Sequence, residues 1–84
     1  MDALRDFQSL PIIFTKHAAL MLIERFELDL SEAKHCIKTA KIDKPFEKDG
    51  SIGTLQSNIG ECRIKFVCTI KRNTLVVITV EECK

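Results

Sequence analysis

The alternation of apolar and polar residues is clearest in the last quarter of the chain. Residues 61–71 and 74–82 are rich in β-branched side chains and alternate in polarity, as the two strands of an antiparallel hairpin do. Arg72 and Asn73 separate them, and asparagine tolerates the positive φ that a two-residue hairpin turn requires. We expect one face of this hairpin to form the core, and its apolar residues are Ile64, Phe66, Cys68, Ile70, Leu75 and Val77.

The register of the hairpin decides which residues face one another. The predicted cross-strand pairs are Ile70–Leu75, Cys68–Val77, Phe66–Thr79 and Ile64–Glu81. This register puts Thr79 on the core face and Cys62 opposite Cys83. A disulfide between these two cysteines is therefore geometrically feasible, whereas the reducing conditions of the cytosol argue against it.

The first half of the chain predicts two helices. Thr15 is a good N-cap for a helix over residues 16–27, whose apolar face would comprise Ala19, Leu20, Ile23 and Phe26. Ser31 is the expected N-cap of the second helix, whose apolar face would comprise Ala33, Cys36, Ile37 and Ala40. The short joint over residues 28–30 makes the two helices a helical hairpin.

The remaining segments carry weaker patterns. Residues 1–10 form either a short helix or an ordered lead-in, and residues 12–14 form a short edge strand after Pro11. Glycine, proline and charged residues over 41–53 predict a loop, and residues 54–58 predict a further strand. The chain as a whole, residues 1–84, is thus expected to be a single α+β domain, with two helices packed on a three- to four-stranded antiparallel sheet.

Composition narrows the function classes. The 13 basic residues nearly balance the 12 acidic ones, so any binding of nucleic acid needs a local cluster of cations rather than a global field. No cationic leader and no membrane-length apolar run appear, and we expect a cytoplasmic protein without a membrane partner. The four cysteines lack zinc-ligand spacing, and no phosphate-binding glycine loop or nucleophile elbow appears. We therefore expect neither a metal nor a cofactor.

Two residues of the first predicted helix are candidates for catalysis. Histidine exchanges protons near neutral pH, so His17 is a candidate proton-transfer group or phosphate contact. Arg25 follows it by about two helical turns and lies on nearly the same side, where a guanidinium could hold a phosphate. Alternatively, His17 is a surface residue bonded to a backbone carbonyl, and Arg25 pairs with a nearby carboxylate.

Three cations share one face of the first hairpin strand. Arg63, Lys65 and Lys71 are separated by even numbers of residues, so their side chains point to the same side of the sheet. Such a row can follow a nucleic-acid backbone. A solvated strand face with lysines that prevent edge-to-edge pairing gives the same pattern. The opposite strand adds Val76, Ile78 and Val80 to this face, which makes it half basic and half apolar.

Three short segments resemble a family of domains grouped with BrnT-type and RelE-type toxins among the metal-independent ribonucleases. They are Ile13-Phe14-Thr15-Lys16-His17-Ala18, Glu24-Arg25 with the residues up to Ala33, and the closing Leu75-Val76-Val77-Ile78-Thr79-Val80. The resemblance spans residues 12–82. It implies two helices on a curved antiparallel sheet, an RNA-binding surface on the opposite sheet face, and His17, Arg25 and Arg63 as functional polar residues.

Two hypotheses of function follow. In the first, the chain is a small RelE/BrnT-like endoribonuclease, including the role of a toxin held by an antitoxin. His17 would transfer a proton, while Arg25, Arg63 and Lys65 would stabilise charge on the phosphate and Lys71 would add an RNA contact. In the second, the same fold is a non-catalytic module that binds RNA or a protein, with an apolar patch of Val67, Val76, Ile78 and Val80 for a partner or a homodimer.

Overall fold

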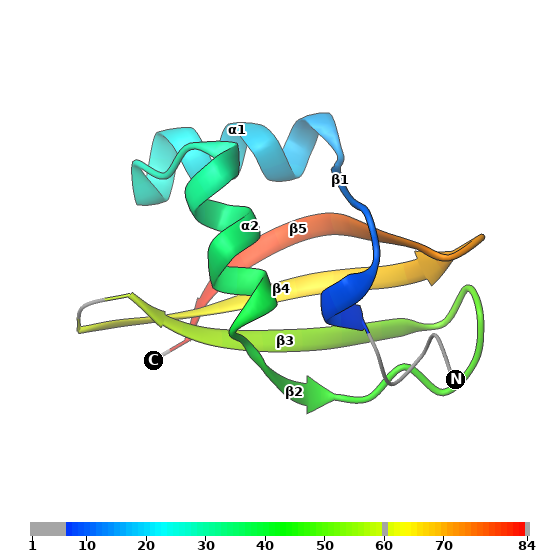
Figure 1. Cartoon of the computed structure of the whole chain (residues 1–84). Coiled ribbons are helices and arrows are strands. Elements are labelled where there is room, and N and C mark those ends of the chain that lie inside the picture. The colour runs from blue at the N-terminus through cyan, green and yellow to red at the C-terminus, as the bar shows by residue number, and fades with distance from the viewer. Residues whose placement is uncertain (1–6, 60, 84) are drawn as a thin grey trace.

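The structure is a computed structural model, which describes residues 7–59 and 61–83. Within these residues it has one 3₁₀ turn, two helices and five strands (Figure 1). In chain order the elements are η1 (Phe7–Ser9), β1 (Ile12–Phe14), α1 (Lys16–Phe26), α2 (Leu30–Lys38), β2 (Lys41–Lys44), β3 (Ile52–Ile59), β4 (Cys62–Lys71) and β5 (Thr74–Cys83). The 3₁₀ turn falls within the lead-in predicted over residues 1–10, of which residues 1–6 lie outside the described part of the chain.

The strands form one mixed sheet in the order β1-β5-β4-β3-β2. β1 runs parallel to β5, and every other pair of neighbours is antiparallel. The α+β class is confirmed, but the sheet has five strands and not the three or four expected, and it is not purely antiparallel. The strand that the prediction missed is β2, which lies in the segment 41–53 taken as a loop. All four of its residues are exposed, so it lacks the alternating burial that identifies a strand.

Both helices lie on the same side of the sheet, where α1 packs against β5 and α2 against β3 (Figure 1). Thr15 is the N-cap of α1, as predicted, and its Oγ1 accepts a hydrogen bond from the backbone N–H of Ala18. The N-cap of α2 is Asp29 rather than the expected Ser31. Asp29 forms a capping box with Glu32, in which each side chain accepts a hydrogen bond from the other residue's backbone N–H.

The buried face of α1 differs from the predicted one. Ala18 and Leu22 are fully buried, whereas Leu20 and Ile23 are 45% and 57% exposed. The helix carries apolar residues on more than half of its circumference, so the sequence pattern is compatible with either of two faces packing against the sheet. The hydrogen bonds that fix Thr15 against β5 select the one that buries Ala18 and Leu22.

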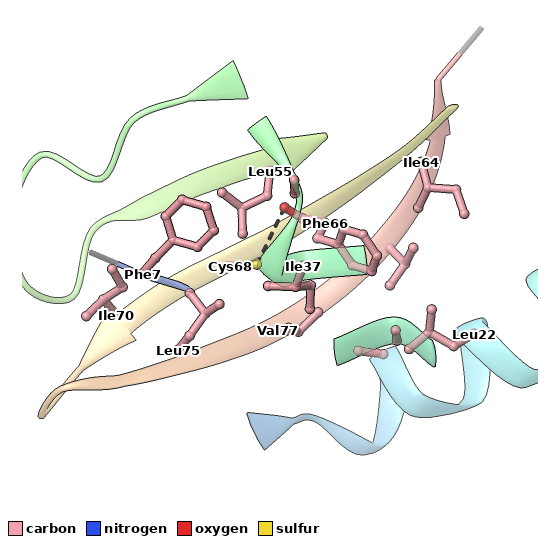
Figure 2. Close-up of a cluster of buried hydrophobic side chains, with 14 of the residues drawn as sticks. Phe7, Leu22, Ile37, Leu55, Ile64, Phe66, Cys68, Ile70, Leu75 and Val77 are labelled. Carbon is pink, nitrogen blue, oxygen red and sulfur yellow. Dashed lines mark hydrogen bonds between the residues drawn. The ribbon is translucent and has the colours of Figure 1, made fainter. Parts of the chain in front are cut away.

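The core lies between the helix pair and the inner face of the hairpin (Figure 2). All six residues predicted for this face are buried, and Leu22, Ile37 and Leu55 pack against them from α1, α2 and β3 (Figure 2). Val80, predicted for the opposite face, is also fully buried and belongs to this core.

A β-bulge in β5 explains the change at Val80. Up to the pair Cys68–Val77 the predicted register is confirmed, and the turn residues Arg72 and Asn73 both have positive φ, 51° and 57°. Beyond that pair the register shifts by one residue, because Val67 lies opposite Thr79 and leaves Ile78 as the extra residue.

The bulge overturns the predicted pairs beyond it. Phe66 lies opposite Val80 and not Thr79, and Ile64 lies opposite Glu82 and not Glu81. Cys83 lies opposite Arg63 rather than Cys62. Cys62 itself lies opposite Ile59 in β3 and is an exposed free thiol, and the side chain of Cys83 lies outside what the structure describes. The pairing of Cys62 with Cys83 that made a disulfide geometrically feasible is therefore absent.

Candidate functional site

The face of the sheet that the helices leave uncovered, here called the outer face, carries most of the candidate residues. Val67, Lys65 and Arg63 alternate on β4 with the buried Ile64, Phe66 and Cys68, so they lie on the outer face. Thr79 lies opposite Val67 and therefore belongs to this face as well. The bulge thus moves Thr79 from the predicted core position to the surface where the cations lie.

His17 contacts the outer face through Thr79. Its Nε2 lies 3.1 Å from the Thr79 Oγ1, within hydrogen-bond distance, and the direction of the bond depends on the tautomer of the imidazole. The predicted alternative, a bond from His17 to a backbone carbonyl, is not what the described residues show. The imidazole is exposed, and its Nδ1 has no hydrogen-bond partner within residues 7–59 and 61–83.

The start of α1 is held at the bulge by Thr15. The Thr15 backbone N–H donates to the Val77 carbonyl at 3.0 Å, and the Thr15 hydroxyl donates to the Ile78 carbonyl at 2.8 Å. β1 pairs with β5 only as far as Val77, so beyond this point the edge of β5 is open to the first turn of α1. Two local features, the N-cap of α1 and the bulge in β5, therefore position His17 together.

Lys65 lies on the outer face, on the strand next to that of Thr79. It is two residues from Val67 on the same strand, which makes it the diagonal neighbour of Thr79, at about 7–8 Å between Cα atoms. Its Nζ lies 3.3 Å from Oδ2 of Asp43 in β2. The Thr54 hydroxyl donates to the same oxygen at 3.0 Å, and this bond, followed by the contact with Lys65, lowers the pKa of Asp43.

The other predicted site residues are further away. Arg63 is exposed on the outer face, two residues beyond Lys65 and opposite Asn58 of β3. Lys71 lies at the other end of β4, about 26 Å along the strand from Arg63. Arg25 is exposed in the last turn of α1, about 12 Å along the helix from His17, and no carboxylate in the described part of the chain forms an ion pair with it. Lys65 and Arg63 therefore share the outer face with Thr79, and Arg63 lies about 13 Å along β4 from Val67, the residue opposite Thr79.

Sequence reasoning missed several polar residues of β3 next to these cations. Gln56 lies opposite Lys65 and Asn58 opposite Arg63, and both amides lie on the outer face. The signal was present, because Thr54, Gln56 and Asn58 are the alternate polar residues of a predicted strand. Their position beside the cations depends on the order of strands in the sheet, which the sequence pattern did not provide.

The end of the outer face near the β4–β5 turn is apolar. Ile13, Val76, Thr69 and Ile52 lie side by side on four neighbouring strands, and the two isoleucines are 55% and 50% exposed. Val67 and Ile78 are partly exposed nearby. The predicted apolar patch therefore loses Val80 to the core and is extended by Ile13 and Ile52.

The described residues contain neither a metal-binding cluster nor a membrane-spanning helix. Residues 7–59 and 61–83 hold no group of three or more histidine, cysteine or carboxylate side chains arranged to bind a metal ion. None of the helices described here has the length and apolar character needed to cross a membrane.

The fold and this site define an α+β domain whose uncovered sheet face combines a histidine, cations and amides at one end with apolar residues at the other. Comparisons with protein-family models, with curated proteins and with solved structures found no match. The resemblance to the BrnT and RelE groups therefore stays a prediction.

Proposed function

We propose that this domain binds single-stranded RNA on the polar end of its outer face and cleaves it as a small endoribonuclease. The observation that carries the proposal is the contact between His17 and Thr79 at the bulge. It brings a side chain that transfers protons near neutral pH onto the same face as Lys65 and Arg63. RNA cleavage through the 2′-hydroxyl uses a proton-transfer group together with cations that stabilise charge on the phosphate.

In this proposal each residue has a defined role. The 2′-oxygen of the ribose forms a bond to phosphorus while the bond from phosphorus to the 5′-oxygen breaks, which yields a 2′,3′-cyclic phosphate and a 5′-hydroxyl. Neutral His17 takes the proton of the 2′-hydroxyl on Nδ1, and water supplies a proton to the departing 5′-oxygen. Lys65 and Arg63 stabilise the negative charge that develops on the phosphate. Thr79 is a positioning residue, because its hydroxyl holds the other ring nitrogen.

Arg25 and Lys71 take a smaller part. Lys71 lies about 26 Å along β4 from Arg63, and Arg25 lies on α1 rather than on the outer face of the sheet. Their proposed role is to hold neighbouring phosphates of the RNA backbone, which strengthens binding without acting on the reacting bond.

The test measures cleavage of a fluorescently labelled single-stranded RNA by the purified chain. His17→Ala should lower the cleavage rate by about 10²–10⁴-fold, the usual contribution of a general acid–base group. The matched control is His35→Ala, because His35 is the other histidine of the chain and is exposed in the last turn of α2. Thr79→Val keeps the shape of the side chain and should give a smaller loss.

Two results would reject the proposal. One is cleavage that persists at the wild-type rate in His17→Ala, which would show a different catalytic group or a contaminating nuclease. The other is the absence of any RNA binding by the wild-type chain. RNA ends that lack a cyclic phosphate would reject the proposed chemistry even if cleavage occurs.

A second candidate function, a non-catalytic module that binds a protein, is favoured by the apolar end of the outer face. Ile13 and Ile52 expose half or more of their surface in one row across the sheet, as interface residues do. The partner would be a second copy of the chain or a small protein such as an antitoxin. A wild-type dimer in analytical ultracentrifugation that Ile13→Lys converts to a monomer, with no RNA cleavage, would favour this candidate.

A further inference from the structure

A polar cleft lies at the edge of the sheet where β3 extends beyond the start of β2. The first paired residue of β2 is Lys41, which lies opposite Gln56, so residues 57–59 of β3 continue past it. The cleft has a volume of about 320 Å³ and is lined by Thr39 and residues 41–43 on one side and residues 56–58 on the other. We call it the edge cleft. Its volume is at the small end of the range of ligand sites.

Two amides in the edge cleft have unused hydrogen-bonding capacity. Gln56 and Asn58 lie two residues apart on the same face of β3, and neither side chain has a hydrogen-bond partner among the described residues. By contrast, the Thr39 hydroxyl already faces the carbonyls of His35 and Cys36. An amide presents a donor and an acceptor side by side, which matches the edge of a nucleobase.

The remaining lining residues include one isoleucine and two charged side chains of opposite sign. Ile42 is 42% exposed, but it lies opposite the buried Leu55, so its side chain belongs to the other face of the sheet from the two amides. Asp43 brings a carboxylate that pairs with the Lys65 ammonium at 3.3 Å, and Lys41 brings a cation to the same cleft. Because the cleft carries charges of both signs, its preference for a ligand comes from the two amides, whose donors and acceptors fit the edge of a base.

The cations of the outer face lie next to the same amides. Gln56 is directly opposite Lys65, and Asn58 is directly opposite Arg63. A nucleotide whose phosphate contacts Lys65 or Arg63 can therefore direct its base across β3 towards the edge cleft. Proteins that recognise single-stranded RNA hold unstacked bases in this way, through the polar edges of the base.

We infer that the edge cleft binds one unstacked base of a single-stranded RNA whose backbone lies on Lys65 and Arg63. Gln56 and Asn58 bond the edge of this base. This inference rests on the proposed RNA binding and adds to it a base-binding subsite that the catalytic residues do not include.

The experiment uses fluorescence anisotropy to compare binding of a complete RNA oligonucleotide with binding of a set of abasic versions. All of them carry 2′-O-methyl groups that prevent cleavage, and each abasic version lacks the base at one position. The proteins are the wild-type chain, Asn58→Ala, the double variant Gln56→Ala/Asn58→Ala, and His35→Ala as the control outside the cleft. Circular dichroism confirms that each variant is folded.

The double variant should bind the complete RNA about tenfold to hundredfold more weakly than the wild-type chain does. It should bind one of the abasic RNAs as tightly as the wild-type chain binds that RNA, because the base and the amides belong to one interaction. Asn58→Ala should give a smaller loss in the same sense, and His35→Ala none.

The outcomes separate the two proposals. If Lys65→Ala and Arg63→Ala weaken binding but the amide changes do not, the edge cleft is not a base site and the proposed RNA binding stands. An equal loss on complete RNA and on every abasic RNA also rejects the base site, because it would mean a general effect of the substitutions. If the wild-type chain binds no RNA at all, both proposals are wrong.

Discussion

Replacing Gly53 by alanine tests how closely β2 and the segment after it pack on β3. A Cβ at this position would lie 2.8 Å from the backbone oxygen of Lys44 and 2.8 Å from Cδ1 of Phe46. The first contact involves β2 itself and cannot be relieved by a side-chain rotation. The second involves a ring that is only 5% exposed, so the ring has little room to move. We therefore expect β2 to be displaced from β3.

The cost can be estimated from these contacts. Forcing an extra methyl group into a packed site costs about 1–3 kcal/mol. A domain of 84 residues has a total free energy of unfolding of about 4–13 kcal/mol, so the loss is a large fraction of the whole. In a domain of this size each kcal/mol lowers Tm by about 4–8 °C.

Urea unfolding followed by far-ultraviolet circular dichroism measures the effect, because the chain has no tryptophan or tyrosine to serve as a fluorescent reporter. Gly50→Ala is the matched control: Gly50 has a φ of +85°, but a Cβ there meets no atom within 4 Å. It reports the cost of backbone strain without a steric clash. Adding Phe46→Leu to Gly53→Ala should recover only the part of the loss that the ring causes.

A free energy of unfolding for Gly53→Ala within about 0.5 kcal/mol of the wild-type value would refute the reasoning. It would mean that β2 adjusts freely against β3. The edge cleft would then have no fixed shape, since β2 forms one of its sides.

Two further predictions concern the helix cap and the ion pair. Asp29→Ala should lower the free energy of unfolding by about 1 kcal/mol, because it removes the capping box, whereas Ser31→Ala should change it little. Urea unfolding measures both variants, and equal losses of free energy would contradict the assignment of Asp29 as the cap. Asp43 has a pKa below its ordinary value, so it stabilises the fold above the pKa of the unfolded chain, and this contribution is lost as the pH falls through the folded value. The free energy of unfolding of the wild-type protein should therefore fall more on acidification than that of Asp43→Asn. If the two free energies change in parallel with pH, the contacts of Asp43 with Thr54 and Lys65 contribute nothing to stability.

Sequence patterns predicted the elements whose burial alternates strongly. The hairpin of β4 and β5, its turn at Arg72 and Asn73 and its buried face all follow from period-two alternation. The N-cap of α2 was missed although its signal is in the sequence, because Asp29 and Glu32 have the spacing of a capping box. β2 could not be recognised from the pattern, because its residues are exposed on both faces and its position depends on pairing with β3.

The candidate site was predictable only in part, since its residues come together through a feature that leaves no mark in the sequence. The residues from Leu75 to Val80 are all suited to a strand, so the sequence allows either Thr79 or Val80 to face the core. No local feature of the sequence indicates a bulge at Ile78. The bulge coincides with a contact from a residue that is distant in the sequence. The Thr15 hydroxyl donates a hydrogen bond to the Ile78 carbonyl. The same bulge buries Val80 and turns Thr79 outward to His17. The core and the site therefore depend on one irregularity: without an extra residue in β5, Thr79 would face the core, and His17 would have no hydroxyl to hold it at the outer face.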